Sequence, residues 1–234
     1  MFLNIDTADA LKRIDEILGN GVEKVVVKEK KSPRRLLNYI LSIRREPERD
    51  VLSYLKSRGL EPTRAIKQAT LTYWHEGKKM GNYEAMVCRI VAHDNKPESF
   101  HITYLENGRK AKVPMSKKVM TPMRTITGGA IRLFKPSEIL GIAEGVETAL
   151  SCSKMFKIPV WSVVTANGME NFIPPNGVRK LVIFADNDES FTGQASAYIC
   201  AKINKARGLD VEVKTSVLGD FNDDLMDLIE SGRF

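Results

Sequence analysis

The sequence predicts an α/β protein in which a mainly parallel sheet flanked by helices follows a smaller, basic α+β lobe. From Pro136 onward, apolar runs of strand length alternate with segments of helical spacing, which is typical of a parallel sheet with helices on its faces. Residues 65–135 instead hold short β-rich runs broken by Gly, Asn and Pro turns. The charge divides at the same point, because residues 1–135 contain 27 Lys and Arg against 15 Asp and Glu, whereas residues 136–234 contain 9 against 14. A basic part favours contact with a polyanion, and an acidic part favours solvated surface or cation binding.

Residues 1–46 are predicted to be a helical segment. Asp6 or Thr7 would cap a first amphipathic helix that ends at the Gly19-Asn20-Gly21 turn. The pair Ser32-Pro33 would open a second helix, RRLLNYILSIRR, whose apolar residues lie on one side.

Residues 47–135 are predicted to form the basic α+β lobe. A helix should run from about Pro47 to Gly59, followed by β-rich runs in LTYWHEG, YEAMVCRIVAHD, ESFHITYLENGRKAKVP and GGAIRLF. Asn107-Gly108 is the residue pair that a type I′ turn prefers, so a hairpin is expected there.

Residues 136–234 are predicted to form the parallel sheet and its helices. The strands should be EILGIA, PVWSVV, KLVIFA and VEVKTSV, and the helices should include ETALSCSKMF and GQASAYICAKINKARG. Acidic residues follow three of these strands: Glu144 and Glu147 after the first, Asp186 and Asp188 after the third, and Asp220 after the fourth.

These three acidic clusters are predicted to meet, because the carboxyl ends of parallel strands lie at the edge where open α/β sheets bind ligands. Carboxylates that converge there repel one another unless a cation sits among them. Their hard oxygen atoms suit Mg2+ or Mn2+, ions that stabilise the charge developing on an attacked phosphoryl group.

The runs around these clusters carry a family resemblance. LGIAEGVETALS is similar to the glutamate motif of Toprim domains, which have a Rossmann-like fold, and LVIFADND is similar to their Asp-x-Asp motif. DFNDDL resembles the closing acidic motif of the branch found in phage and plasmid primases. Upstream, SYLKSRGL, AMVCRIV, HITYLENGRKAKVP and GGAIRLF resemble the primase-associated region that precedes this lobe. The resemblance implies that residues 47–135 are a primase-associated lobe and residues 136–234 a Toprim catalytic lobe.

The resemblance also implies residue roles. Glu144 takes the position of the catalytic acid or base, and Asp186 and Asp188 take those of metal ligands, so that the three together form the expected catalytic and Mg2+ or Mn2+ site. Glu147 and Asp220 are secondary acidic candidates.

Seven basic residues before the acidic part would line a path for phosphates. They are Arg109, Lys110, Lys112, Lys117, Lys118, Arg124 and Arg132. Lys110, Lys112 and Arg132 are favoured for nucleic-acid binding because they lie in the family-like runs, with Arg109 and Arg124 as further candidates. Four aromatic residues, Tyr73, Trp74, Tyr83 and Tyr104, could stack on bases, although core packing is expected for them.

The resemblance implies a DNA primase-type nucleotidyltransferase that acts on single-stranded DNA through a Mg2+-dependent Toprim site. Its partners would be single-stranded DNA and nucleotides, together with a helicase or a separate template-recognition protein. Two alternatives stay open. One is a Toprim nuclease that uses water at the same metal site. The other is a non-catalytic nucleic-acid-binding or interaction protein in phage or plasmid replication or host defence.

The remaining sequence features exclude several classes. No run reaches the roughly 18 to 20 apolar residues that a bilayer span requires, and the N-terminus lacks the order of a signal peptide, so a cytoplasmic protein without a membrane partner is expected. Cys88, Cys152 and Cys200 are too far apart for the paired ligands of a zinc ribbon and are expected to be reduced core residues.

Overall fold

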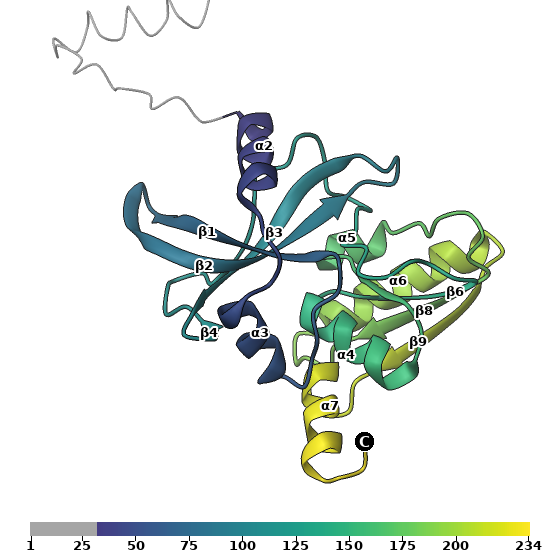
Figure 1. Ribbon diagram of the computed structural model, residues 1–234. Helices are drawn as coiled ribbons and strands as arrows, with labels where there is room; N and C mark the ends of the chain where they lie inside the picture. Colours follow the sequence, from purple (N-terminus) through teal and green to yellow (C-terminus); the bar gives the residue numbers. More distant parts are fainter. Residues whose placement is uncertain (1–31) are drawn as a thin grey trace, which may run out of the picture. The chain divides into compact units, whose positions relative to one another are not determined.

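The computed structural model describes residues 32–234, of which Pro33–Phe234 form one unit (Figure 1). The first helix expected in the sequence, with its cap at Asp6 or Thr7, lies outside the described residues. The expected bounds of the 1–46 segment therefore stay a prediction.

Two helices precede the first strand. Helix α2 (Pro33–Ile43) begins at the expected proline, because the fixed φ of proline suits the first helical position, and it buries Leu37 and Ile40. Helix α3 (Arg49–Lys56) buries Val51, Tyr54 and Leu55. The chain leaves α3 through Gly59, whose φ of 68° is in the left-handed region.

An antiparallel sheet follows, with the strand order β1-β2-β3-β4. Its strands are β1 (Ile66–His75), β2 (Lys78–Val91), β3 (Pro97–Glu106) and β4 (Arg109–Lys110), and β5 (Lys117–Val119) also pairs with β3. The β3–β4 turn has positive φ at both Asn107 (52°) and Gly108 (70°), as a type I′ turn requires, so the predicted hairpin is confirmed.

The strand expected in GGAIRLF does not form. Ala130 and Ile131 make only isolated bridges, to Val91 of β2 and to Ser162 respectively. Ala130 therefore pairs with the antiparallel sheet and Ile131 with the parallel sheet. Because the segment changes its partner strand after one residue, it forms no continuous ladder with either sheet.

The aromatic residues divide between core and surface. Tyr73, Tyr83 and Tyr104 contact one another edge-to-face, with ring centroids 4.9 to 6.4 Å apart. They lie in or against the core on the face of the sheet that α2 covers, as expected. Trp74 is instead 52% exposed, so core packing does not describe it.

The second sheet is parallel, with the strand order β7-β6-β8-β9. Its strands are β6 (Ile139–Ala143), β7 (Val160–Ser162), β8 (Lys180–Ala185) and β9 (Asp210–Thr215). Helices α4 (Val146–Phe156) and α7 (Phe221–Glu230) pack on one face, and α5 (Ala166–Glu170) and α6 (Thr192–Ala206) pack on the other. This arrangement confirms the predicted fold class.

The two sheets share one hydrophobic core. A single cluster joins Leu55 of α3, Met86 and Ile90 of β2, Leu150 of α4 and Phe221 of α7. Figure 1 shows the antiparallel sheet on one side of α3 and helices α4 and α7 on the other side of α3. The expected boundary between residues 135 and 136 remains a prediction.

A buried asparagine joins two helices and the segment after α3 at this contact. Asn222, which is 2% exposed, donates from Nδ2 to the Arg58 carbonyl (2.9 Å) and to Ser151 Oγ (3.1 Å). Its Oδ1 accepts from Arg58 Nη1 at 3.0 Å. One amide in the run DFNDDL therefore connects α7 to α4 and to the residues that follow α3.

Replacing Asn222 with Ala should lower the free energy of unfolding by about 2 to 3 kcal/mol, because buried partners lose their hydrogen bonds. Urea denaturation measures this loss. Asn38→Ala, on the exposed side of α2, is the matched control and should change stability by less than about 0.5 kcal/mol. Equal losses of stability in Asn222→Ala and Asn38→Ala would show that the hydrogen bonds of Asn222 do not stabilise the contact between the lobes.

Candidate active site

Glu144 and Asp186 leave neighbouring strands at the same edge of the parallel sheet. The β6–β8 register pairs Ala143 with Phe184, so both carboxylates follow the carboxyl ends of their strands. The backbone of Glu144 is held in place, since its carbonyl accepts from Val164 N (2.9 Å) and from Ser162 Oγ (2.7 Å). Val164 has a φ of 70°, a strained value for a β-branched residue, directly beside this contact.

Asp186 is the centre of a repelling group of carboxylates. Burial, followed by the charges of Asp220, Glu144 and Asp188, raises its pKa to about 7, although Lys117 opposes the shift. Its Oδ1 is buried and has no hydrogen-bond partner among residues 32–234. Burial and Asp188 also raise the pKa of Glu144, again against Lys117. Three other carboxylates are therefore within electrostatic reach of Asp186.

The loop that carries Asp188 is tied to the loop before α7. Asn187 N donates to the Gly219 carbonyl at 2.7 Å, and Ser190 Oγ donates to Asp188 Oδ1 at 2.7 Å. A Cβ at Gly193 would lie 3.6 Å from Asp188 Oδ2, so the first turn of α6 comes close to this carboxylate. Asp188 itself is exposed.

The third acidic cluster has mainly structural contacts. Asp220 caps α7, and its Oδ1 accepts from the backbone N–H groups of Asn222 (2.7 Å) and Asp223 (3.0 Å). Asp224 accepts from the N–H groups of Val217 and Leu218. Asp220 can thus turn only part of its carboxylate toward Asp186.

Glu147 lies under the acidic edge, in contact with the antiparallel lobe. It is 4% exposed, accepts from the Tyr54 hydroxyl at 2.5 Å and pairs with Lys117 Nζ at 2.9 Å. Burial alone would raise the pKa of Glu147, but Lys117 and Tyr54 hold it down to about 2. Both oxygens of Glu147 already have protein partners, and the carboxylate fixes the ammonium group of Lys117 beside the acidic edge.

The five predicted basic residues do not form one surface. Lys110 lies near Lys117, because they pair with Leu105 and Thr103 of β3 respectively. Burial and then the charge of Lys117 lower the pKa of Lys110, while Glu147 and Asp220 oppose the shift. Arg109 and Lys112 are exposed nearby in sequence. Arg124 pairs with Asp94 and Glu98, so its charge is already compensated. Arg132 lines a separate pocket.

Sequence reasoning missed the special position of Lys117. It counted as one of seven cations, whereas in the fold it influences the pKa values of Glu144, Glu147 and Asp186. No local pattern marks this residue, because its place depends on the pairing of β5 with β3.

The acidic edge fits a divalent cation in its chemistry. Within the described part of the chain, no three His, Cys, Asp or Glu side chains are close enough together to hold a metal ion. The donor atoms are nevertheless hard carboxylate oxygens, and Asp186 Oδ1 is buried without a partner. Glu144, which is half-buried, and Asp188, which is exposed, carry the further carboxylate oxygens of this edge.

Family comparisons define the class of the C-terminal part. Residues 139–229 match the family described as a Toprim domain, and residues 28–133 match a family described as a domain of unknown function (DUF7146). The chain therefore carries a Toprim domain at its parallel sheet. No curated protein matches the sequence.

Solved structures extend the likeness to the preceding lobe. The crystal structure of the Aquifex aeolicus primase, with its zinc-binding and RNA polymerase domains, matches with a TM-score of 0.56 at 13% identity, covering 98% of this chain and 66% of that one. A DnaG primase catalytic domain bound to ssDNA matches with a TM-score of 0.47 at 11% identity, covering 88% of this chain and 74% of that one. A DNA primase domain from Pseudomonas aeruginosa gives 0.45 at 10% identity, with 95% and 76% covered. The Aquifex match carries the comparison and concerns the fold: this chain has the fold of a primase catalytic core.

None of the helices in residues 32–234 has the length and apolar character needed to cross a bilayer.

Replacing Lys117 with Met should lower the free energy of unfolding by about 3 kcal/mol or more, because Glu147 would be left buried without its cation. Adding Glu147→Gln to this variant should restore more than half of the loss, since the amide keeps a partner for Tyr54 and removes the charge. A double-mutant cycle in urea measures the coupling.

Lys118→Met, at the next position of β5, is the control. Lys118 donates to the Trp74 carbonyl and lies 3.8 Å from the centroid of the Tyr73 ring, so its loss should cost about 1 kcal/mol and be independent of Glu147. A further loss on adding Glu147→Gln to Lys117→Met would contradict the ion-pair account.

Proposed function

We propose that this protein is a primase-like nucleotidyltransferase that acts on single-stranded DNA through a Mg2+-dependent Toprim site. The observation that carries the proposal is Asp186, whose buried Oδ1 lacks a partner among the described residues while three carboxylates act on it. A cation would relieve this repulsion and satisfy the free oxygen. In the proposal, Glu144, Asp186 and Asp188 hold a Mg2+ or Mn2+ ion.

The fold supports synthesis of a nucleic acid strand. The Aquifex aeolicus match is named a primase with an RNA polymerase domain, and it spans both lobes of this chain. This chain spans 66% of the length of that one, so the activity of the whole relative enters here as part of the proposal. Ribonucleoside triphosphates are the substrates that this likeness suggests.

The reaction joins a 3′-hydroxyl to an incoming nucleotide. The hydroxyl oxygen bonds to the α-phosphorus, the bond from that phosphorus to the bridging oxygen of the β-phosphate breaks, pyrophosphate leaves and the hydroxyl proton needs an acceptor. Glu144 is the residue assigned to accept this proton. A bound divalent cation supplies charge neutralisation at the phosphoryl group. Lys117, held by Glu147, adds a fixed positive charge at the same edge.

Substrate strands would approach from the basic lobe. Lys110 is exposed and lies near Lys117, and Arg109 and Lys112 flank it in sequence. These cations would contact phosphates and position the strand without reading its sequence. Arg124 contributes little to this contact in the proposal, because Asp94 and Glu98 occupy its guanidinium.

The test of the function is incubation of the purified chain with single-stranded DNA, labelled ribonucleotides and Mg2+ or Mn2+, followed by separation of extended from cleaved products. Extended products are expected. Asp186→Asn with Asp188→Asn should reduce their yield at least about 100-fold, because the developing phosphoryl charge loses its counter-ion.

Asp223→Asn is the matched control, since this exposed carboxylate belongs to the same acidic motif but is not among the causes of the Asp186 pKa shift. It should leave the yield within about two-fold of wild type. Shortened DNA without extension would favour the nuclease, and full activity in the double variant would exclude this edge as the catalytic centre.

Binding of single-stranded DNA should weaken with salt, because each neutralised phosphate releases counterions. Replacing Lys110 and Lys112 with Ala should lower affinity and flatten the slope of log K against log salt by about 1.4, the value for two contacts to a single strand. Fluorescence anisotropy at several salt concentrations measures both quantities.

Arg179→Ala with Arg207→Ala removes the same net charge from exposed positions of the acidic lobe and serves as the control. The slope should stay unchanged in this variant. If the lysine pair and the arginine pair flatten the salt slope equally, binding depends only on net charge, and the residues beside β4 form no specific path for the strand.

A further inference from the structure

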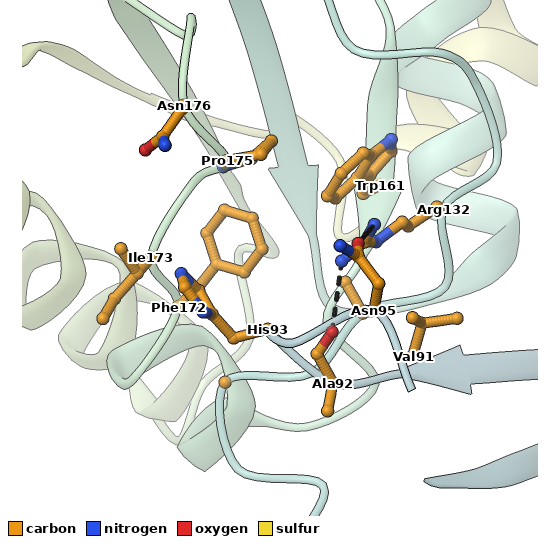
Figure 2. A pocket seen from close by; sticks show the side chains of 12 residues that line it. Val91, Ala92, His93, Asn95, Arg132, Trp161, Phe172, Ile173, Pro175 and Asn176 are labelled. Atoms are coloured by element: carbon orange, nitrogen blue, oxygen red, sulfur yellow. Dashed lines mark hydrogen bonds between the residues drawn. The ribbon is translucent and has the colours of Figure 1, made fainter. Parts of the chain in front are cut away.

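A second charged pocket lies apart from the acidic edge, with a volume of about 380 Å3 (Figure 2). It lies where the β2–β3 turn, residues 128–132, β7 and the chain after α5 meet. None of the carboxylates of the acidic edge lines it. Its volume is in the range of small-molecule sites, which are about 300 to 1,000 Å3.

Arg132 is the cation of this pocket, and its guanidinium is held in a fixed position. Nη2 donates to the Ala92 carbonyl at 3.1 Å, and Nη1 donates to Asn95 Oδ1. The guanidinium also lies over the ring of Trp161, 5.0 Å from its centroid. Figure 2 shows these groups together on one side of the pocket.

The charge of Arg132 has no acidic partner within residues 32–234. Its hydrogen-bond acceptors are a carbonyl and an amide, both neutral, and its Nε is buried without a partner among these residues. Burial lowers the pKa of Arg132, and the nearby charge of Arg89 lowers it further. Arginine remains charged at neutral pH, so a partly buried cation beside a second cation favours an anion in the pocket.

The opposite wall of the pocket is apolar. Phe172, Ile173 and Pro175 form it, and Asn176 adds an amide beside them (Figure 2). The Phe172 ring contacts Trp161 edge-to-face, with centroids 6.3 Å apart, which fixes the base of this wall. Ile173 is 39% exposed and lies at the rim. The pocket therefore has a fixed guanidinium on one side and a small apolar surface, mainly Ile173 and Pro175, on the other, because Phe172 is itself buried.

We propose that this pocket binds a nucleotide, with a phosphate on Arg132 and the nucleoside against the wall formed by Phe172, Ile173 and Pro175. A guanidinium matches the geometry of phosphate oxygens, and an apolar wall suits the face of a base. The nucleotide is either free or the 5′-phosphorylated end of a strand. This site goes beyond the proposed catalysis, because it does not depend on metal binding or turnover at the acidic edge.

Isothermal titration of the full chain with AMP in the presence of EDTA tests the site without metal at the acidic edge. Ile173→Asp puts a shorter, charged side chain into the wall that holds the nucleoside and should weaken AMP binding at least about ten-fold, because the base loses an apolar contact and the added carboxylate opposes a negatively charged ligand. Ile173→Asn matches Ile173→Asp in size but lacks the charge, so it should weaken AMP binding less than Ile173→Asp does. Arg132→Gln should also weaken binding at least about ten-fold.

Further ligands and variants identify what is recognised. Adenosine should bind much more weakly than AMP, and a trinucleotide with a 5′-phosphate should compete with AMP better than the same trinucleotide without it if strand ends are the source. Asp186→Asn with Asp188→Asn should keep AMP binding, which separates this site from the proposed catalytic one.

Two results would overturn the proposal. One is wild-type affinity for AMP in Ile173→Asp, a variant that keeps the fold because the position is at the surface. The other is a wild-type protein that binds neither AMP nor the phosphorylated trinucleotide at millimolar concentrations. Thermal unfolding of each variant shows whether a loss of binding reflects loss of the fold. Arg132→Gln is the more destabilising of the two substitutions, because Arg132 is hydrogen-bonded and Ile173 is at the surface.

Discussion

Carboxylates that repel one another at a single sheet edge are the constraint on which the rest of this structure depends. The parallel pairing of β6 with β8 sets Glu144 and Asp186 at that edge, and burial removes much of the water that would screen them. The fold compensates with one fixed cation, Lys117, which is bound to the buried Glu147. Repulsion at the edge and the ion pair below it thus belong to one electrostatic arrangement.

This arrangement explains why the two lobes share a core. Lys117 comes from β5 and Tyr54 from α3, so both partners of Glu147 belong to the antiparallel lobe, whereas Glu147 lies on α4. The shared apolar cluster includes Tyr54 and residues of α4, so it packs around this ion pair. Asn222 strengthens the same contact by joining α7 to Arg58 and Ser151. A parallel sheet alone would leave Glu147 without its partners.

The sequence predicted the features that local patterns encode. Strand and helix periods gave the parallel sheet, Asn107-Gly108 gave the hairpin, and the position of Glu144 and Asp186 after strands placed them at one edge. Long-range contacts escaped prediction for a physical reason. The compensation of Arg124 by Asp94 and Glu98, the pairing of Lys117 with Glu147, and the change of sheet after Ala130 all depend on residues distant in sequence. Charge and motif alone could not separate a compensated arginine from a free one.

The central claim is that the acidic edge holds a divalent cation around Asp186. Crystals of the protein soaked in Mn2+ test it most directly, because the anomalous scattering of manganese locates the ion independently of any activity. The account predicts a peak within about 2.6 Å of Asp186 Oδ1 and of an oxygen of Glu144 or Asp188. Crystals that show manganese only at other positions, or none at this edge at saturating Mn2+, would contradict the account.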